Sequence, residues 1–463
     1  MSRIRVIGRP RILFRDRDSG SIVSADWPLP LYSLRLPKTR FPSEYENYRR
    51  FLERFAPYRS PSTRFRGKVC ILVVGEDEAW CGLVADRLSS SPFARKWFWD
   101  GKDIEILSLP LPDAYGRLSD LYESPPRNRN LLRVSLDIWR DIEEELAKFI
   151  SKVDAIVFEV FPEQYSVEFF GVGNILYVLS EELKYRFGIP VQHLSLGTPS
   201  KTRFYDNHIH HYIFHGLDGV LFEPDPRWVF GDLGEFMFIS FDLSYPVFEG
   251  RSTIRFVGIV VTLRNSFVRG SALILPSIIS VGGLYFDVRK ILPNIISSRD
   301  PNNIIVLADG SSPKDLVNAF VDGIHEVKPD ARVLYVDVVK GVNVKFFRVV
   351  NGRYYNPSEA IYEPFGLDSV FVQFHRLRGG GWKSPRSLLF RVRSNEIFDR
   401  GVLDVVARMA RAFQAASQTT YEYEYLRVPP LIQRADRISY ILRLLSVVGR
   451  SIPSGEYPLG LLG

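Results

Sequence analysis

Two short apolar segments that each end on an aspartate constrain this chain more than any other feature. They are residues 235–244 (EFMFISFDLS) and residues 303–311 (NIIVLADGS). Both are rich in β-branched and aromatic residues and too short for a core helix, so they predict strands buried on both faces. Such strands bring Asp242 and Asp309 to a sheet edge, where carboxylates suit Mg²⁺ or Mn²⁺ in phosphodiester chemistry. The alternative is that each aspartate only starts a turn or caps a helix.

Strand-like and helix-like segments alternate from residue 67 to about residue 195. The strand-like segments are KVCILVVG, DIEILSLP, DAIVFEVF and IPVQHLSL, and helical patterns separate them. This order predicts a parallel, Rossmann-like sheet with right-handed crossovers, although no GxGxxG phosphate motif accompanies it. We assign this domain to residues 63–225. Residues 1–62 are a lead-in rich in Pro, Arg and aromatic residues, which we expect to pack on a larger unit.

The pattern changes after residue 226. Three consecutive strand-like segments predict an antiparallel meander, and the strand, helix, strand order that follows adds parallel strands to it. This is the order of a ribonuclease H-like sheet, which we assign to residues 226–463. The predicted fold class is therefore α/β, with a Rossmann-like domain followed by a ribonuclease H-like domain.

The composition indicates what kind of partner the chain binds and in which cellular compartment it folds. The formal charge is +7, the chain is 46% hydrophobic, and its basic residues are mostly Arg, which binds phosphate through a planar, bidentate fork. This favours a polyanionic partner. With two cysteines there is no disulfide framework, which fits a reducing cytoplasm. No window reaches the roughly 18 apolar residues of a membrane span, so we expect a soluble protein without membrane contact.

Three motifs resemble, in order and spacing, the PIWI domain of Argonaute proteins. They are FISFDLS, LADGSSPKDLVNAF followed by ARVLYVDVVK, and VPPLIQRADRISYILRLL. The resemblance implies metal-binding positions at Asp242, Asp309 and Asp436. Upstream, GIPVQ (residues 188–192) and a preceding helix with Tyr177 resemble the MID domain segment that holds the 5′ end of a guide strand. Because no room remains for N and PAZ domains, the chain resembles a short prokaryotic Argonaute of archaeal type.

The resemblance also implies a fourth acid, a glutamate between the third strand and the Asp-Gly strand. Residues 274–300 contain no glutamate, only Asp287 and Asp300. Three carboxylates without the fourth could hold one ion or cleave slowly, because two-metal hydrolysis needs both ions clamped. We therefore expect binding and not cleavage, with Asp242, Asp309 and Asp436 vestigial or metal-holding.

Residues around the guide 5′ end are implied by the same resemblance: Tyr177, Lys184, Gln192, His215 and the C-terminal carboxylate of Gly463. The resemblance implies that this carboxylate tucks back toward the guide's first nucleotide and its metal ion, unless the tail packs on the core or a partner. Gly463 is therefore a candidate metal ligand, as are Asp242 and Asp309. Glu181 shares a helix face with Tyr177 and Lys184 and would repel a phosphate. Either the guide carries a 5′ hydroxyl or a metal ion bridges acid and phosphate. The alternative is a solvated charged helix face.

Two further segments carry candidate binding residues. Residues 375–394 form the densest basic stretch and predict backbone contacts from Arg376, Arg378, Lys383, Arg386, Arg391 and Arg393, with Arg391 and Arg393 on one strand face. A solvated loop and strand edge is the alternative. His211 and His215 have an i, i+4 zinc spacing without an evident third ligand, so packing or backbone contacts are favoured there.

These observations favour a guide-dependent nucleic-acid binding protein of a prokaryotic Argonaute defence system. The partners implied by the resemblance are a small guide RNA or DNA, a complementary target, and a separately encoded Argonaute-associated protein, either an effector or an N/PAZ-like chain. One alternative is a metal-dependent endonuclease in which Asp287 or Glu249 replaces the missing acid. Another is an α/β interaction protein without a nucleic-acid role.

Overall fold

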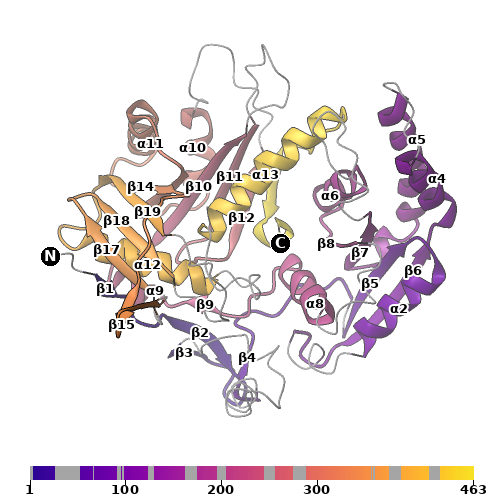
Figure 1. Ribbon diagram of the computed structural model, residues 1–463, viewed down its shortest axis with the longest axis horizontal. Helices are drawn as coiled ribbons and strands as arrows, with labels where there is room; N and C mark the ends of the chain where they lie inside the picture. The colour runs from indigo at the N-terminus through magenta and orange to yellow at the C-terminus, as the bar shows by residue number, and fades with distance from the viewer. Residues whose placement is uncertain are drawn as a thin grey trace. The chain divides into compact units, whose positions relative to one another are not determined.

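The computed structural model divides the chain into two compact units (Figure 1). The RNase H-like unit holds the described residues of Met1–Tyr58, Phe222–Ser244 and Thr253–Ser439, and the Rossmann-like unit holds those of Arg59–Leu221 and Tyr440–Gly463. The structure describes residues 4–26, 53–65, 67–90, 95, 98–123, 130–161, 175–195, 205–244, 256–274, 288–355, 357, 360–374, 387–416 and 428–462.

A parallel sheet forms the Rossmann-like unit, as the alternation of strands and helices predicted. Its strands lie in the order β6 (Asp103–Pro110), β5 (Lys68–Gly75), β7 (Ala155–Val160) and β8 (Val191–Ser195). Its helices are α2 (Glu78–Ser89), α4 (Pro112–Glu123), α5 (Asn130–Ala147), α6 (Ile175–Phe187) and α8 (Tyr205–Gly216), with a short η2 (Ile150–Lys152). The apolar runs of β5 and β7 are buried on both faces, as expected for a parallel sheet between helices.

The RNase H-like unit has the predicted meander followed by parallel strands. β10 (Phe236–Ser244), β11 (Phe256–Thr262) and β12 (Gly270–Ile274) are antiparallel. β13 (Asn303–Asp309) and β14 (Arg332–Val339) continue the sheet in parallel from β10. Beyond β14 lie β19 (Leu388–Asn395), β18 (Ser369–Gln373), β17 (Ile361–Phe365) and β1 (Arg5–Val6). The ribonuclease H-like prediction is therefore confirmed.

Helices cover both faces of this sheet. Met237, Ile239 and Phe241 pack in a core with α10 (Val288–Ser297) and α11 (Lys314–Val327). On the other face Phe238 contacts Phe413 of α12 (Val402–Ala416), with ring centroids 5.1 Å apart. Also in the unit are α9 (Pro226–Phe230) and the start of α13 (Pro430–Val447). No helix in the described residues is both long and apolar enough to cross a bilayer.

The described part of the lead-in packs on the RNase H-like unit. β2 (Arg11–Asp16) pairs with β3 (Ile22–Asp26), β4 (Phe55–Ala56) and β9 (Glu223–Pro224), and β1 pairs with β17. Phe14 is buried and stacks on Phe55 at 5.4 Å. Phe14 also lies 5.7 Å from Phe222, so these described aromatic residues pack the lead-in on the RNase H-like unit.

Candidate functional site

Asp242 and Asp309 lie side by side at the carboxyl ends of two parallel strands. Phe241 of β10 pairs with Ala308 of β13, so the following residue on each strand is an aspartate. Side chains alternate between the faces of a strand. Since Phe241 and Ala308 belong to the core with α10 and α11, Asp242 and Asp309 point to the opposite face. The sequence-predicted pair is thus brought together.

Helix α13 covers that opposite face and brings the third aspartate. A Cβ added to Gly258 of β11 would lie 1.9 Å from the carbonyl oxygen of Ala435, so only glycine permits this close approach of the helix to the sheet. Ser439, one turn after Asp436 on α13, donates a hydrogen bond of 2.8 Å to Asp242 Oδ2. The three aspartates therefore gather at one edge of the sheet.

Lys340 brings a positive charge to this group. It follows the end of β14, whose Val338 pairs with Asp309, and its Nζ lies 2.5 Å from Asp309 Oδ2. Burial raises the pKa of Asp309, the ion pair with Lys340 lowers it, and repulsion from Asp242 and Asp436 raises it further, with a net upward shift. Sequence reasoning did not assign Lys340 to the site, although it is the last residue of the strand-like segment ARVLYVDVVK.

The described side chains do not by themselves form a metal centre. Within the described ranges no three His, Cys, Asp or Glu side chains have an arrangement that could hold a metal ion. The side chain of Asp309 contacts an ammonium, and that of Asp242 accepts a hydroxyl hydrogen. The candidate ligands Gly463, Asp287 and Glu249 lie outside the described residues. Mg²⁺ or Mn²⁺ at this edge stays a prediction.

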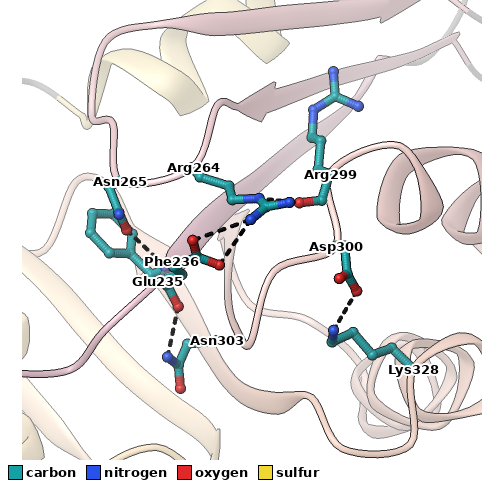
Figure 2. Close-up of polar contacts among 8 residues, drawn as sticks. All are labelled: Glu235, Phe236, Arg264, Asn265, Arg299, Asp300, Asn303 and Lys328. Atoms are coloured by element: carbon teal, nitrogen blue, oxygen red, sulfur yellow. Dashed lines mark hydrogen bonds and ion pairs between the residues drawn. The ribbon is translucent and has the colours of Figure 1, made fainter.

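Asp300 lies at the wrong end of β13 to complete the aspartate group. It precedes the strand and pairs with Lys328, as Figure 2 shows, whereas Asp309 is the strand's last residue. Seven residues of strand separate such positions by about 20 Å. At this same end of the sheet, Asn303 of β13 is joined to the residue before β10. Its Nδ2 donates a hydrogen bond of 2.7 Å to the carbonyl oxygen of Glu235 (Figure 2).

Arg393 is committed to an internal ion pair. Its Nη1 lies 2.7 Å from Oδ2 of the fully buried Asp337 and 2.9 Å from the carbonyl oxygen of Ser312. The register of β14 and β19 shifts here, so Arg393 is the extra residue of a bulge. If Arg393 turned to bind a phosphate, the buried carboxylate of Asp337 would lose its ion-pair partner. Arg391 is half-buried opposite Asp337. Four predicted backbone-binding residues lie outside the described residues: Arg376, Arg378, Lys383 and Arg386.

In the Rossmann-like unit, the predicted guide lysine is paired with an acid. Lys184 Nζ lies 2.6 Å from Glu181 Oε1 on α6, and the two side chains are 4% and 0% exposed. The alternative of a solvated helix face is therefore wrong for these two residues. Their neighbour on α6, Glu182, pairs with Arg450 of the C-terminal segment at 2.7 Å, and Arg450 also pairs with Glu143 at 2.8 Å.

His193 links the remaining predicted guide residues, and sequence reasoning missed it. Its Nε2 lies 2.7 Å from Ser180 Oγ, its Nδ1 lies 3.4 Å from Glu181 Oε1, and its ring centroid lies 4.7 Å from that of Tyr177. Gln192 Nε2 donates to the carbonyl oxygen of His193 at 3.0 Å. Tyr177, Glu181 and His193 thus form one cluster between α6 and β8, with Lys184 paired to Glu181 and Gln192 next to His193 in the strand. Its only sequence signal was the position next to Gln192.

His215 contacts His211 on α8. Their Nε2 atoms are 2.8 Å apart, and His215 Nδ1 lies 2.8 Å from the carbonyl oxygen of Gly219. A donor at Nδ1 makes Nε2 of His215 the acceptor, so His211 donates. Both histidines are buried, which agrees with packing. Within the described residues no third metal-binding side chain joins them.

The C-terminal tail lies against α8 near His215. β20 (Gly455–Pro458) leads into η4 (Leu459–Leu462), where Leu459 and Leu461 are buried. A Cβ added to Gly460 would lie 2.0 Å from the carbonyl oxygen of His215. The described tail is therefore packed, as the alternative had it, and Gly463 lies outside the described residues.

Comparison with known proteins identifies the fold. No family model and no curated protein matches the sequence. The Argonaute of Clostridium butyricum bound to a guide DNA and a 19-mer target DNA is similar, with a TM-score of 0.64 and 14% identity over 96% of this chain and 53% of that one. The C-terminal lobe of a budding yeast Argonaute gives 0.62 and 10%, over 96% and 89%. Kluyveromyces polysporus Argonaute with a guide RNA gives 0.61 and 10%, over 96% and 53%.

The chain therefore has the fold of the Argonaute C-terminal lobe, with MID-like and PIWI-like parts. It spans about half the length of the Clostridium butyricum and Kluyveromyces polysporus chains.

Proposed function

We propose that this chain binds a short guide strand and, through it, a complementary nucleic acid, without cutting the target itself. The observation that carries the proposal is that 96% of the chain matches the Argonaute fold, including structures that hold a guide DNA with target DNA and a guide RNA. The basic net charge of +7 supports a polyanionic ligand.

We expect no cleavage because of the contacts that the aspartates already make. Lys340 and Ser439 already contact Asp309 and Asp242, and Asp300 lies at the far end of β13. A two-metal mechanism needs carboxylates free to clamp both ions. We assign Asp242, Asp309 and Asp436 a structural role in closing α13 onto the sheet.

The guide 5′ end is assigned to the cluster between α6 and β8. Because Glu181 neutralises Lys184, this lysine offers no net charge to a phosphate. We therefore propose that 5′ recognition relies on Tyr177, His193 and Gln192, and that a 5′ hydroxyl is accepted about as well as a 5′ phosphate. An Argonaute-associated partner chain and a role in cytoplasmic defence are part of the same proposal.

The experiment is a binding series with defined oligonucleotides. Single strands of RNA and DNA, each with a 5′ phosphate or a 5′ hydroxyl, are titrated with the purified chain, and labelled complementary target is then added. We expect saturable guide binding and target capture only by matched sequence. Equal capture of unrelated targets, or binding that does not weaken with salt, contradicts the proposal and favours an interaction protein, because phosphate binding releases counterions.

A guided nuclease is the second candidate, favoured by the gathering of three aspartates at one sheet edge. Incubation of the guide-loaded chain with matched target in Mn²⁺ tests it. We expect intact target. Cleavage that disappears in Asp309→Asn would establish the nuclease instead.

A further inference from the structure

A two-stranded hairpin of the RNase H-like unit carries exposed aromatic side chains. β15 (Arg348–Val350) and β16 (Arg353–Tyr355) are joined by Asn351 and Gly352, whose φ angles of 49° and 72° are those of a tight type I′ turn. Two strands with this turn form a ribbon of fixed register, in which Val349 lies opposite Tyr354.

One face of this hairpin is aromatic and open to solvent. Phe347, Val349 and Tyr354 are 43%, 59% and 74% exposed. The rings of Phe347 and Tyr354 lie 5.9 Å apart, edge to face. Isolated two-stranded ribbons are marginally stable in water, and contiguous exposed apolar side chains are a feature of binding surfaces.

The charge of the hairpin indicates what binds there. Every charged residue from 341 to 357 is basic, namely Lys345, Arg348 and Arg353, and this stretch contains no acid. Lys345 and Arg353 are exposed. Aromatic faces interleaved with cations suit a ligand that combines planar rings with negative charge, as a single-stranded nucleic acid does.

The base of the hairpin is fixed to the sheet. The side chain of Gln373, at the end of β18, makes two hydrogen bonds of 2.8 Å with the backbone of Phe346, one to its N–H and one to its carbonyl oxygen. Gln373 is fully buried and Phe346 is 6% exposed. The aromatic face therefore projects from a rigid support, which reduces the entropy lost on binding.

We propose that this hairpin is a binding site for single-stranded nucleic acid, with bases stacking on Phe347 and Tyr354 and phosphates contacting Lys345 and Arg353. The site does not require a guide or pairing, so it goes beyond the proposed function. It would hold an unpaired segment of any strand that the protein engages.

An exposed turn on the large sheet of the same unit supplies a matched control. Phe365 at the end of β17 and Leu367 in the turn that follows are 63% and 98% exposed, but their charged neighbours in sequence are the acids Glu363 and Asp368. An acidic setting repels phosphate, so Phe365 tests exposure of an aromatic ring without the basic context.

The experiment measures the affinity of the chain for fluorescein-labelled oligothymidylate by anisotropy, with no guide present. We expect Phe347→Ala and Tyr354→Ala each to weaken binding about five-fold or more, since base stacking contributes about this much per ring. Tyr354→Trp should retain it, Phe365→Ala should leave it unchanged, and Arg353→Ala should lower the salt slope by about 0.7. Circular dichroism confirms that each variant is folded.

A second measurement does not depend on variants. Oligothymidylate with 4-thiothymidine is irradiated with the unmodified chain, and we expect crosslinked peptides from residues 345–355. Unchanged affinity in both Ala variants, equal loss in Phe365→Ala, or crosslinks only elsewhere overturns the proposal, including the case in which the hairpin binds a protein. If guide-directed target capture fails while the expected affinity losses and hairpin crosslinks are observed, the proposed function is overturned and the hairpin site stands.

Discussion

Lys340 brings a positive charge against Asp309, beside the carboxylates of Asp242 and Asp436. An ammonium on a flexible stem neutralises one carboxylate but cannot bridge several as a divalent ion does. At the residue scale, the ammonium of Lys340 supplies the positive charge that a bound metal ion would otherwise supply to these aspartates.

Replacing Lys340 should therefore create a metal-binding site. In Lys340→Met the pKa of Asp309 rises further because the ion pair is lost, and its repulsion from Asp242 and Asp436 goes uncompensated. We expect Mn²⁺ at ten times its Kd to stabilise this variant by about 1.4 kcal/mol, measured by thermal unfolding with and without Mn²⁺. The unmodified chain and the control Lys345→Met should show no shift. A shift in all three would mean that metal binds without displacing Lys340.

Glu159 gives the Rossmann-like unit a pH-dependent stability. It is fully buried in β7, accepts a 2.7 Å hydrogen bond from the N–H of Glu76, and burial raises its pKa to about 8. A carboxyl whose folded-state pKa lies above its ordinary value contributes stability that is fully present at low pH. That contribution is lost as pH rises from about 4.5 through about 8.

The variant Glu159→Gln should remove this dependence. We expect the difference in unfolding free energy between the unmodified chain and the variant to shift in favour of the variant as pH rises from 5 to 9. Urea unfolding at a series of pH values measures it, and groups common to both chains cancel. A difference that stays constant with pH would show that Glu159 does not titrate in this range.

At the scale of elements, the close contact between the tail and α8 depends on the absence of a side chain at Gly460. In Gly460→Ala the new methyl group meets the carbonyl oxygen of His215, so the tail must move away from α8. We expect a loss of about 1–3 kcal/mol, as for other overpacked contacts, and faster hydrogen exchange in residues 455–462. The control Gly455→Ala meets its nearest atom only at 3.6 Å. Equal exchange in both variants would show that the tail does not depend on this contact.

Sequence patterns predicted the helices and strands better than they predicted the burial and the contacts of individual side chains. The apolar runs of β10 and β13 could be recognised as strands, and parallel pairing then placed Asp242 beside Asp309. The burial of α6 could not be recognised, because Glu181 and Lys184 have the pattern of a surface pair. They are buried as a pair, and the adjacent Glu182 bonds Arg450, a residue far along the chain that no local pattern contains. The bulge at Arg393 likewise depends on Asp337 of another strand.

At the scale of the whole molecule, the fold follows from order and period. The change from alternating strands and helices to a meander predicted both sheets, and the fold match covers 96% of the chain. The sites were harder, because a resemblance transfers positions but not the contacts that occupy them. Lys340 at the aspartates and Glu181 at the predicted guide lysine are both oppositely charged neighbours that short motifs omit.

The most direct test of guide binding is the nucleic acid that accompanies the chain when it is purified from cells. Its length distribution, sugar type and 5′ chemistry are determined after extraction. Our account predicts a narrow length class that includes 5′-hydroxyl ends, because Lys184 is neutralised by Glu181. A broad smear of lengths, or no nucleic acid at all, would contradict it.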